Sequence, residues 1–254
     1  MSSIFDALRR KEQAGSRKHP PEPESVQFQP AEPPVSTWLD GMDHRGIRDL
    51  EALCERIDLE LPRTGRRVFA VTGTVAGEGA STLGLQLARM MSRTGSGKVL
   101  LVDTDFARTT RTLSQSIGPA EAMPGLADVL TGRVELSRAV LSTDEPNLHF
   151  LPSGLGAIRS HEVMASERMR QLLDEMGRLY GVVVLDCPPI LNHPESPALA
   201  ALSEGVVLVV RAGRTRREVA RRGLALLQGA RCKVLGIVLN ARRYPIPEFI
   251  YRRL

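Results

Sequence analysis

The chain has 254 residues and a formal charge of +5, with 34 lysines and arginines against 29 aspartates and glutamates. A composition of 42% hydrophobic and 25% charged residues excludes wholesale disorder, and 4% aromatic residues argue against a base-stacking RNA surface. No apolar run reaches the roughly 18 residues that span a bilayer. Only four of the basic residues are lysines, so a lysine-dependent mechanism has few positions to use: Lys11, Lys18, Lys98 and Lys233.

The cysteines and the amino terminus indicate the cellular compartment of the protein. Cys54, Cys187 and Cys232 are widely spaced and fit no zinc-binding pattern, which indicates a reducing environment. The first residues lack the apolar core of a secretion signal. We expect a cytoplasmic protein, with peripheral attachment to the inner face of the cell membrane as a second possibility.

Residues 1–14 predict a short amphipathic hook, because Ile4, Phe5 and Leu8 share one face of a helix. Residues 15–37 are rich in proline and predict a semi-extended linker. A globular body then follows at residues 38–243, with a tail at 244–254. Docking or self-association of the hook and a frayed end remain alternatives.

The body alternates short apolar runs with helical segments. Continuous Val, Ile and Leu runs are typical of strands covered on both faces, and they occur at 67–72, 98–103, 181–186, 205–210 and 233–239. Helical spacing appears at 81–92, 168–179 and 216–228. This alternation predicts an α/β fold with a doubly wound, mainly parallel sheet, in which ligands bind beyond the carboxyl ends of the strands.

A glycine-rich stretch, Thr74–Thr82 (TVAGEGAST), connects the first strand to the first helix. Such a loop lets backbone N–H groups converge on a phosphate at the helix N-terminus, and a hydroxyl after it can bind Mg²⁺. The stretch departs from the G-x-x-x-x-G-K-[ST] pattern at Thr74 and Ala80. Alone, such a turn is more often a tight connection than a nucleotide site. The candidate phosphate-binding residues are Gly77, Glu78, Gly79, Ala80, Ser81 and Thr82.

Two acidic segments lie at predicted strand ends. Asp103 and Asp105 lie two residues apart in LLVDTD, and Asp186 ends the strand that precedes CPP. Carboxylates in these places can act on a nucleophile or hold a metal through water. Taken singly, each is also typical of a polar strand end.

Together the three motifs resemble those of the bacterial protein tyrosine kinases of capsular and exopolysaccharide assembly, relatives of the partition and septum-positioning P-loop ATPases. The resemblance covers roughly residues 49–240. Further matching segments are PGLADVLTG at 124–132, NLHFLPSG at 147–154, VVRAGRT at 209–215 and VLGIVLN at 234–240, and SIFDALRR near the amino terminus is similar to the start of many stand-alone kinases.

The resemblance implies a P-loop NTPase fold that binds ATP or ADP with Mg²⁺. It implies Asp103 and Asp105 as catalytic residues, with Asp103 activating tyrosine. It implies Ser81, Asp105 and Asp186 as metal-binding residues. It also implies that Asn240, at the end of the last strand, reads the adenine.

The chain departs from the family at several positions. Ala80 replaces the lysine that neutralises phosphate charge; an arginine such as Arg108 could replace it, although pairing with solvent or a carboxylate is favoured for Arg108. The assembly pattern Glu-x-x-Arg-x-x-Arg keeps Glu51 but has Cys54 and Ile57 at its arginine positions. The tail carries only Tyr244 and Tyr251 instead of a tyrosine cluster.

Two basic segments each allow a structural and a functional interpretation. The tail could be a weak membrane or partner contact, although folding back on the body is favoured. The arginine-rich run at 214–222 is most often a solvated helix face and less often a DNA-contacting patch. We expect no specific nucleic-acid partner.

The sequence thus predicts a cytoplasmic tyrosine-kinase homologue with impaired or lost kinase activity, which regulates exopolysaccharide assembly. Its expected partner is the cytosolic segment of a membrane chain-length or co-polymerase protein. One alternative is an active autokinase in which an arginine or a partner replaces the lysine. The other is a partition-like positioning ATPase that binds DNA or membrane.

Overall fold

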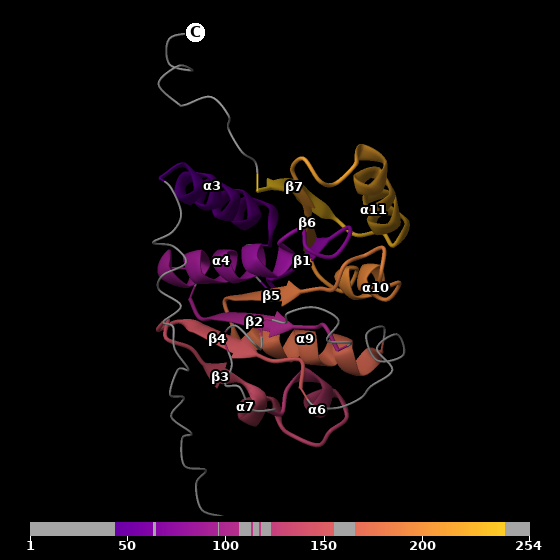
Figure 1. The fold of residues 1–254 in the computed structure, drawn as a ribbon. Coiled ribbons are helices and arrows are strands. Elements are labelled where there is room, and N and C mark those ends of the chain that lie inside the picture. The colour runs from indigo at the N-terminus through magenta and orange to yellow at the C-terminus, as the bar shows by residue number, and fades with distance from the viewer. Residues whose placement is uncertain are drawn as a thin grey trace, which may run out of the picture.

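The computed structural model describes residues 44–62, 65–95, 97–106, 113, 117, 123–154 and 166–241 (Figure 1). The predicted hook and linker, the tail tyrosines and Arg108 lie outside these residues.

A seven-stranded sheet forms the middle of the molecule, in the order β3-β4-β2-β5-β1-β6-β7. All neighbouring strands pair in parallel except β3 and β4, which are antiparallel. The strands are β1 (Val68–Gly73), β2 (Val99–Asp103), β3 (Leu141–Ser142), β4 (Leu148–Leu151), β5 (Val182–Asp186), β6 (Gly205–Arg211) and β7 (Val234–Asn240). The predicted α/β fold with a mainly parallel sheet is confirmed.

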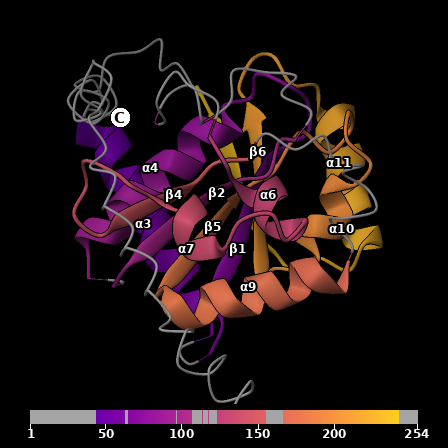
Figure 2. The ribbon, with the colours of Figure 1, turned by 90° about the horizontal axis from the view of Figure 1, so that it is seen from below.

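Helices cover both faces of the sheet and make three layers (Figures 1 and 2). One hydrophobic core lies under α3 (His44–Glu60) and α4 (Ala80–Arg93). The other lies under the remaining helices, which are α6 (Leu126–Leu130), α7 (Leu136–Ala139), α9 (Glu167–Leu179), α10 (Ser196–Ala200) and α11 (Arg217–Gly229).

The continuous apolar strands follow from these two cores. In β1, Val68 and Ala70 face the α9–α11 side, whereas Phe69 and Val71 face the α3–α4 side. Because successive side chains point to opposite faces, a strand buried on both must be apolar throughout. The edge strand β7 is different, and its Ile237 and Leu239 are about half exposed.

Helix α3 buries Leu50, Cys54 and Ile57 along one face, and Leu61, directly after the helix, is buried as well. Cys54 and Ile57 are only 4% and 1% exposed, and burial raises the pKa of the Cys54 thiol to about 12, with the nearby charge of Asp58 contributing. The two positions where the resemblance implies assembly arginines are therefore core positions in this chain. An arginine there would have to place a charged group in this core.

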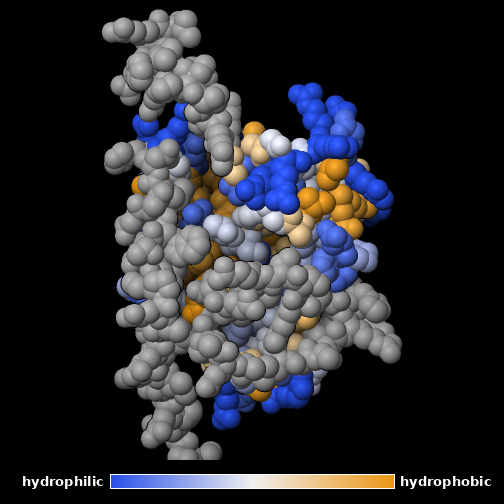
Figure 3. Space-filling view, in the orientation of Figure 1, coloured by the Kyte–Doolittle hydropathy of each residue, from blue (hydrophilic) through white to orange (hydrophobic). Residues whose placement is uncertain are grey.

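Within the described ranges, every helix is too short or too polar to cross a membrane. The predicted helix in the arginine-rich run is confirmed as α11, and Arg217, Arg221 and Arg222 are exposed on it. Figure 3 shows hydrophilic residues together with a hydrophobic patch on this side of the molecule.

Candidate functional site

The loop between β1 and α4 is shaped by two glycines with left-handed backbones. Gly77 has φ of 83° and Gly79 has φ of 89°, conformations that favour glycine. Gly79 is the N-cap of α4 and no side chain caps the helix. The amides of the first turn of α4 are therefore left for a ligand, and a left-handed turn before a helix N-terminus is an anion-binding arrangement.

The side chain of Glu78 stabilises this loop through hydrogen bonds. Its buried carboxylate accepts hydrogen bonds from the backbone N–H groups of Thr74 (2.5 Å) and Val75 (3.0 Å), and from the hydroxyl of Thr215 (2.5 Å). The Thr74 hydroxyl donates to the same carboxylate at 2.7 Å. The side chain of Glu78 thus links the residues directly after β1 to the segment after β6.

Thr74, which stands where the phosphate-loop pattern has glycine, is fully buried. A Cβ added at Gly223 of α11 would lie 2.4 Å from Thr74 Cγ2. The extra bulk at position 74 therefore fits because α11 has a glycine opposite it.

Asn240, at the end of β7, lies against the loop. Its Nδ2 donates to the Glu78 carbonyl at 2.9 Å, and a Cβ added at Gly79 would lie 2.2 Å from that nitrogen. The structure thus places Asn240 beside the predicted phosphate-binding residues, where it positions the loop backbone.

The predicted carboxylates meet at the same edge of the sheet. Asp103 on β2 and Asp186 on β5 are paired in register. The Asp105 N–H donates to Asp103 Oδ1 at 3.0 Å, and the Thr104 hydroxyl donates to the Asp186 carbonyl at 2.7 Å. These bonds fix the end of β2 against the end of β5. Asp105 and Asp186 also line a cavity of about 250 Å³ together with the loop residues from Val75 to Thr82.

Burial dominates the electrostatics of this cluster. It raises the pKa of the Asp186 carboxyl well above its ordinary value, and the charges of Asp103 and Asp105 act in the same direction. A hydrogen bond with Ser81 lowers the pKa and only partly offsets the rise. The three carboxylates therefore favour a cation between them.

The residues fit a divalent cation. Asp186 Oδ1 is buried and has no hydrogen-bond partner within the described residues, and Ser81 adds a hydroxyl beside it. The described ranges contain no group of three His, Cys, Asp or Glu side chains that could hold a metal. Mg²⁺ needs no such group, because it keeps several waters and uses one or two carboxylates together with phosphate oxygens.

Two arginines that the sequence reasoning did not select lie near the loop. Arg211 Nη1 donates to the Gly77 carbonyl at 3.1 Å. Arg214 Nη1 lies 3.9 Å from the position that a Cβ on Gly77 would take. Arg211 ends β6 and Arg214 follows it, 134 residues or more along the chain from Gly77, so local sequence could not indicate their proximity. The only signal was the VVRAGRT segment, which contains them.

Comparison with known proteins gives consistent results. The AAA domain family model matches residues 66–228. The tyrosine-protein kinase YwqD of Bacillus subtilis is 30% identical over 74% of this chain and 78% of its own length. EpsB of Ralstonia nicotianae is 31% identical over 78% of this chain, but the chain spans only 26% of EpsB.

Solved structures of kinase domains are also similar to this chain. The kinase domain of VpsO is 27% identical, with a TM-score of 0.67 over 78% of this chain and 98% of that domain. The kinase domain of Escherichia coli tyrosine kinase ETK has a TM-score of 0.76 at 21% identity, over 87% of this chain and 86% of that domain, and shows the shared fold. The chain is a kinase-like P-loop protein that belongs to the bacterial tyrosine kinase family.

Proposed function

We propose that the chain is a cytoplasmic, nucleotide-binding protein of exopolysaccharide biosynthesis and export, with impaired kinase activity and a regulatory role. The relatives support this setting. YwqD and CpsD are named tyrosine-protein kinases, and ExoP of Rhizobium meliloti is named a succinoglycan biosynthesis transport protein.

One observation carries the proposal. The carboxylates Asp103, Asp105 and Asp186 stay together beside Ser81, whereas Ala80 stands at the lysine position of the same loop. Residues that hold a metal are thus kept, and the residue that neutralises phosphate charge is lost. This combination favours a protein that binds nucleotide more readily than it transfers a phosphoryl group.

Different residues of the chain would bind the phosphates, hold the metal and accept the proton. The amides at the start of α4 would hold the phosphates of ATP or ADP, and Ser81, Asp105 and Asp186 would hold Mg²⁺ directly or through water. Mg²⁺ supplies charge neutralisation at the phosphates. Asp103 would accept the proton of an incoming tyrosine hydroxyl. Ala80 offers a methyl group in place of a charged donor, which weakens stabilisation of charge that develops during transfer.

The proposed partner is the cytosolic segment of a membrane polysaccharide co-polymerase. Support comes from the lengths of the relatives, because the chain matches only 26% of EpsB and 24% of ExoP. In those proteins the kinase-like part is joined to a much longer chain. A segment of this kind is the partner that we propose for this chain.

Autophosphorylation tests the proposal. Purified chain incubated with Mg·ATP and probed with an antibody to phosphotyrosine should give no signal, whereas Ala80→Lys should give one. Adding Asp103→Asn to Ala80→Lys should remove the signal, which ties it to this site. Robust tyrosine phosphorylation of the wild type that is lost in Asp103→Asn would show that the kinase is not impaired.

The arginine beside the loop favours a second candidate, an active kinase with a replaced cation. Arg214 has a guanidinium near Gly77, and its side chain has no hydrogen-bond or ion-pair partner among the described residues. A guanidinium can donate to two phosphate oxygens at once. In this case wild-type chain should hydrolyse ATP, and Arg214→Gln should abolish the hydrolysis.

A further inference from the structure

A second cavity, of about 1020 Å³, lies away from the phosphate loop. Its walls come from α7 and the segment before it, from β3 and β4, and from α9. No residue lines both this cavity and the one at the loop. Its volume is at the upper end of the range for small-molecule sites, roughly 300–1,000 Å³.

The cavity has an excess of positive charge. Four cationic side chains line it against two carboxylates, Glu135 and Glu175. Arg133 is paired with Asp128 at 3.1 Å. The other three cations make no hydrogen bond or ion pair with another described residue, and they are Lys98, Arg138 and Arg168.

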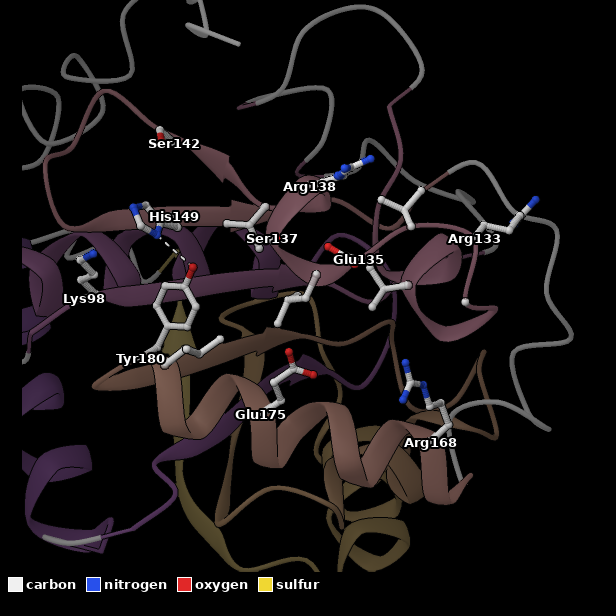
Figure 4. A pocket seen from close by; sticks show the side chains of 16 residues that line it. Lys98, Arg133, Glu135, Ser137, Arg138, Ser142, His149, Arg168, Glu175 and Tyr180 are labelled. Carbon is white, nitrogen blue, oxygen red and sulfur yellow. Dashed lines mark hydrogen bonds between the residues drawn. The ribbon is translucent and has the colours of Figure 1, made fainter. Parts of the chain in front are cut away.

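Most of these charges are separated along the cavity, although Arg138 lies near its middle (Figure 4). Figure 4 shows Lys98 close to His149 and Tyr180 at one end, and Arg133 and Arg168 at the other. Glu135 and Glu175 lie between the two ends (Figure 4). The described cations and carboxylates that line this cavity therefore form no ion pair with one another.

A fixed polar pair stands at the lysine end. His149 Nδ1 and the Tyr180 hydroxyl are 3.0 Å apart, and their rings meet edge to face with centroids 5.5 Å apart. Burial, aided by the charge of Lys98, lowers the pKa of His149, so the ring is neutral at neutral pH. When Tyr180 donates to Nδ1, the neutral ring carries its proton on Nε2 and offers a further donor.

The arrangement limits the ligand. A wholly anionic molecule, such as polyphosphate, would place charge against Glu135 and Glu175. A neutral molecule would gain nothing from the charges of Lys98 and Arg168, which are exposed and solvated in the free chain. A molecule with phosphate at an end and hydroxyl donors along its length satisfies both, because carboxylates accept hydrogen bonds from hydroxyls.

We propose that this cavity binds a sugar phosphate, with phosphate at the cationic ends and sugar hydroxyls donating to Glu135 and Glu175. Free sugar phosphates and nucleotide-linked sugars share this chemistry. The site is separate from the phosphate loop, so it stands whether or not the proposed kinase-like function is correct.

Calorimetry on the full chain without Mg²⁺ tests the proposal, with glucose 1-phosphate, UDP-glucose, glucose and inorganic phosphate as probes. At least one of the first two should bind at least about tenfold more tightly than both glucose and inorganic phosphate. Whether glucose 1-phosphate or UDP-glucose binds better distinguishes the two sources of the ligand.

Variants locate the binding. Lys98→Gln and Arg168→Gln should each weaken it by about tenfold. Arg178→Gln is the matched control for Arg168→Gln. Arg178 is also exposed on α9, but it does not line the cavity. Glu175→Gln should reduce the preference for the sugar phosphate over inorganic phosphate, since it removes a negative charge that repels phosphate and replaces one carboxylate oxygen with an amide donor.

Three results would overturn the proposal. One is no binding of either sugar phosphate, or affinity equal to that for inorganic phosphate. Another is unchanged binding in both Lys98→Gln and Arg168→Gln. The third is loss of binding in Ser81→Ala, which would place the ligand at the phosphate loop instead.

Discussion

Asp103 and Asp186 are paired in register on neighbouring parallel strands, with both carboxyl groups buried at the strand ends. Two like charges so close in a buried place destabilise the folded chain unless a cation or a proton compensates them. The pair therefore destabilises the folded chain and favours the binding of a cation.

Asp186→Asn should therefore stabilise the nucleotide-free chain. The amide keeps the shape and can donate to Asp103, and the gain is on the order of 1–2 kcal/mol, or a few degrees in Tm. Because the folded-state pKa of Asp186 is raised, wild-type stability falls as pH rises from the ordinary aspartate pKa of 3.8 through the raised value. The variant should lose this part of the pH dependence.

Thermal unfolding at several pH values, without metal, measures the effect. The same variant should weaken binding of Mg·ADP, which separates a site role from a purely structural one. A lower Tm for Asp186→Asn at neutral pH would contradict the interpretation of the cluster.

Gly223→Ala should destabilise the chain by about 1–3 kcal/mol, because the new methyl group would meet Thr74 Cγ2. Adding Thr74→Ser should restore most of the loss, since serine lacks that carbon but keeps the hydroxyl that bonds Glu78. Denaturant unfolding measures both.

Gly229→Ala is the matched control on the same helix. Nothing lies within 4 Å of a Cβ there, so it should be neutral or stabilising, by up to about 1 kcal/mol from helix propensity. Equal destabilisation by the two alanine substitutions would show that the contact with Thr74 is not responsible.

His149 should make stability depend on pH in a narrow window. Its pKa is lowered in the folded chain by burial and by Lys98, so the unfolded chain binds the proton more tightly. Stability is therefore retained above the ordinary pKa of 6.5 and is lost as pH falls below it, by at most about 1.4 kcal/mol per pH unit.

An NMR titration of the imidazole checks this prediction. Lys98→Gln should raise the pKa of His149, because it removes the second cause of the shift. Tyr180→Phe should leave burial and the Lys98 charge in place and keep the pKa low. A wild-type pKa above 6.5 would refute the assigned environment.

Arg214→Gln should weaken Mg·ATP binding by about tenfold if Arg214 provides charge at the loop. In the Ala80→Lys background the same substitution should have a much smaller effect, because the lysine then supplies that charge. Arg222→Gln, on the exposed side of α11, is the control. Equal losses in both backgrounds would indicate a general electrostatic effect rather than replacement of the lysine.

Much of the fold could be predicted, because β1, β2, β5 and β6 are continuous apolar runs buried on both faces. Strand β7 has the same apolar pattern, although it is a partly exposed edge strand. The predicted helices at 81–92, 168–179 and 216–228 match α4, α9 and α11 to within one residue at each end. Strand β4 was missed as a strand: it has four residues, and His149 interrupts its apolar pattern. Its conformation depends on pairing with β2, which is not a local property.

The site could be predicted in part. Ser81, Asp105 and Asp186 carry local signals, and the structure brings them together. Arg214 could not be found in this way, because its approach to Gly77 depends on the packing of β6 beside β1. Glu78 lies within a predicted motif, but only the structure shows its carboxylate turned into the loop.

We propose that the site binds nucleotide and that Ala80 weakens its hold on the phosphates. Calorimetry of Mg·ATP and Mg·ADP with wild-type chain and with Ala80→Lys measures this effect. We expect measurable binding of Mg·ADP by the wild type, and Mg·ATP binding about one to two decades tighter in Ala80→Lys. Equal Mg·ATP affinities in the two proteins, or no nucleotide binding in either, would contradict the claim.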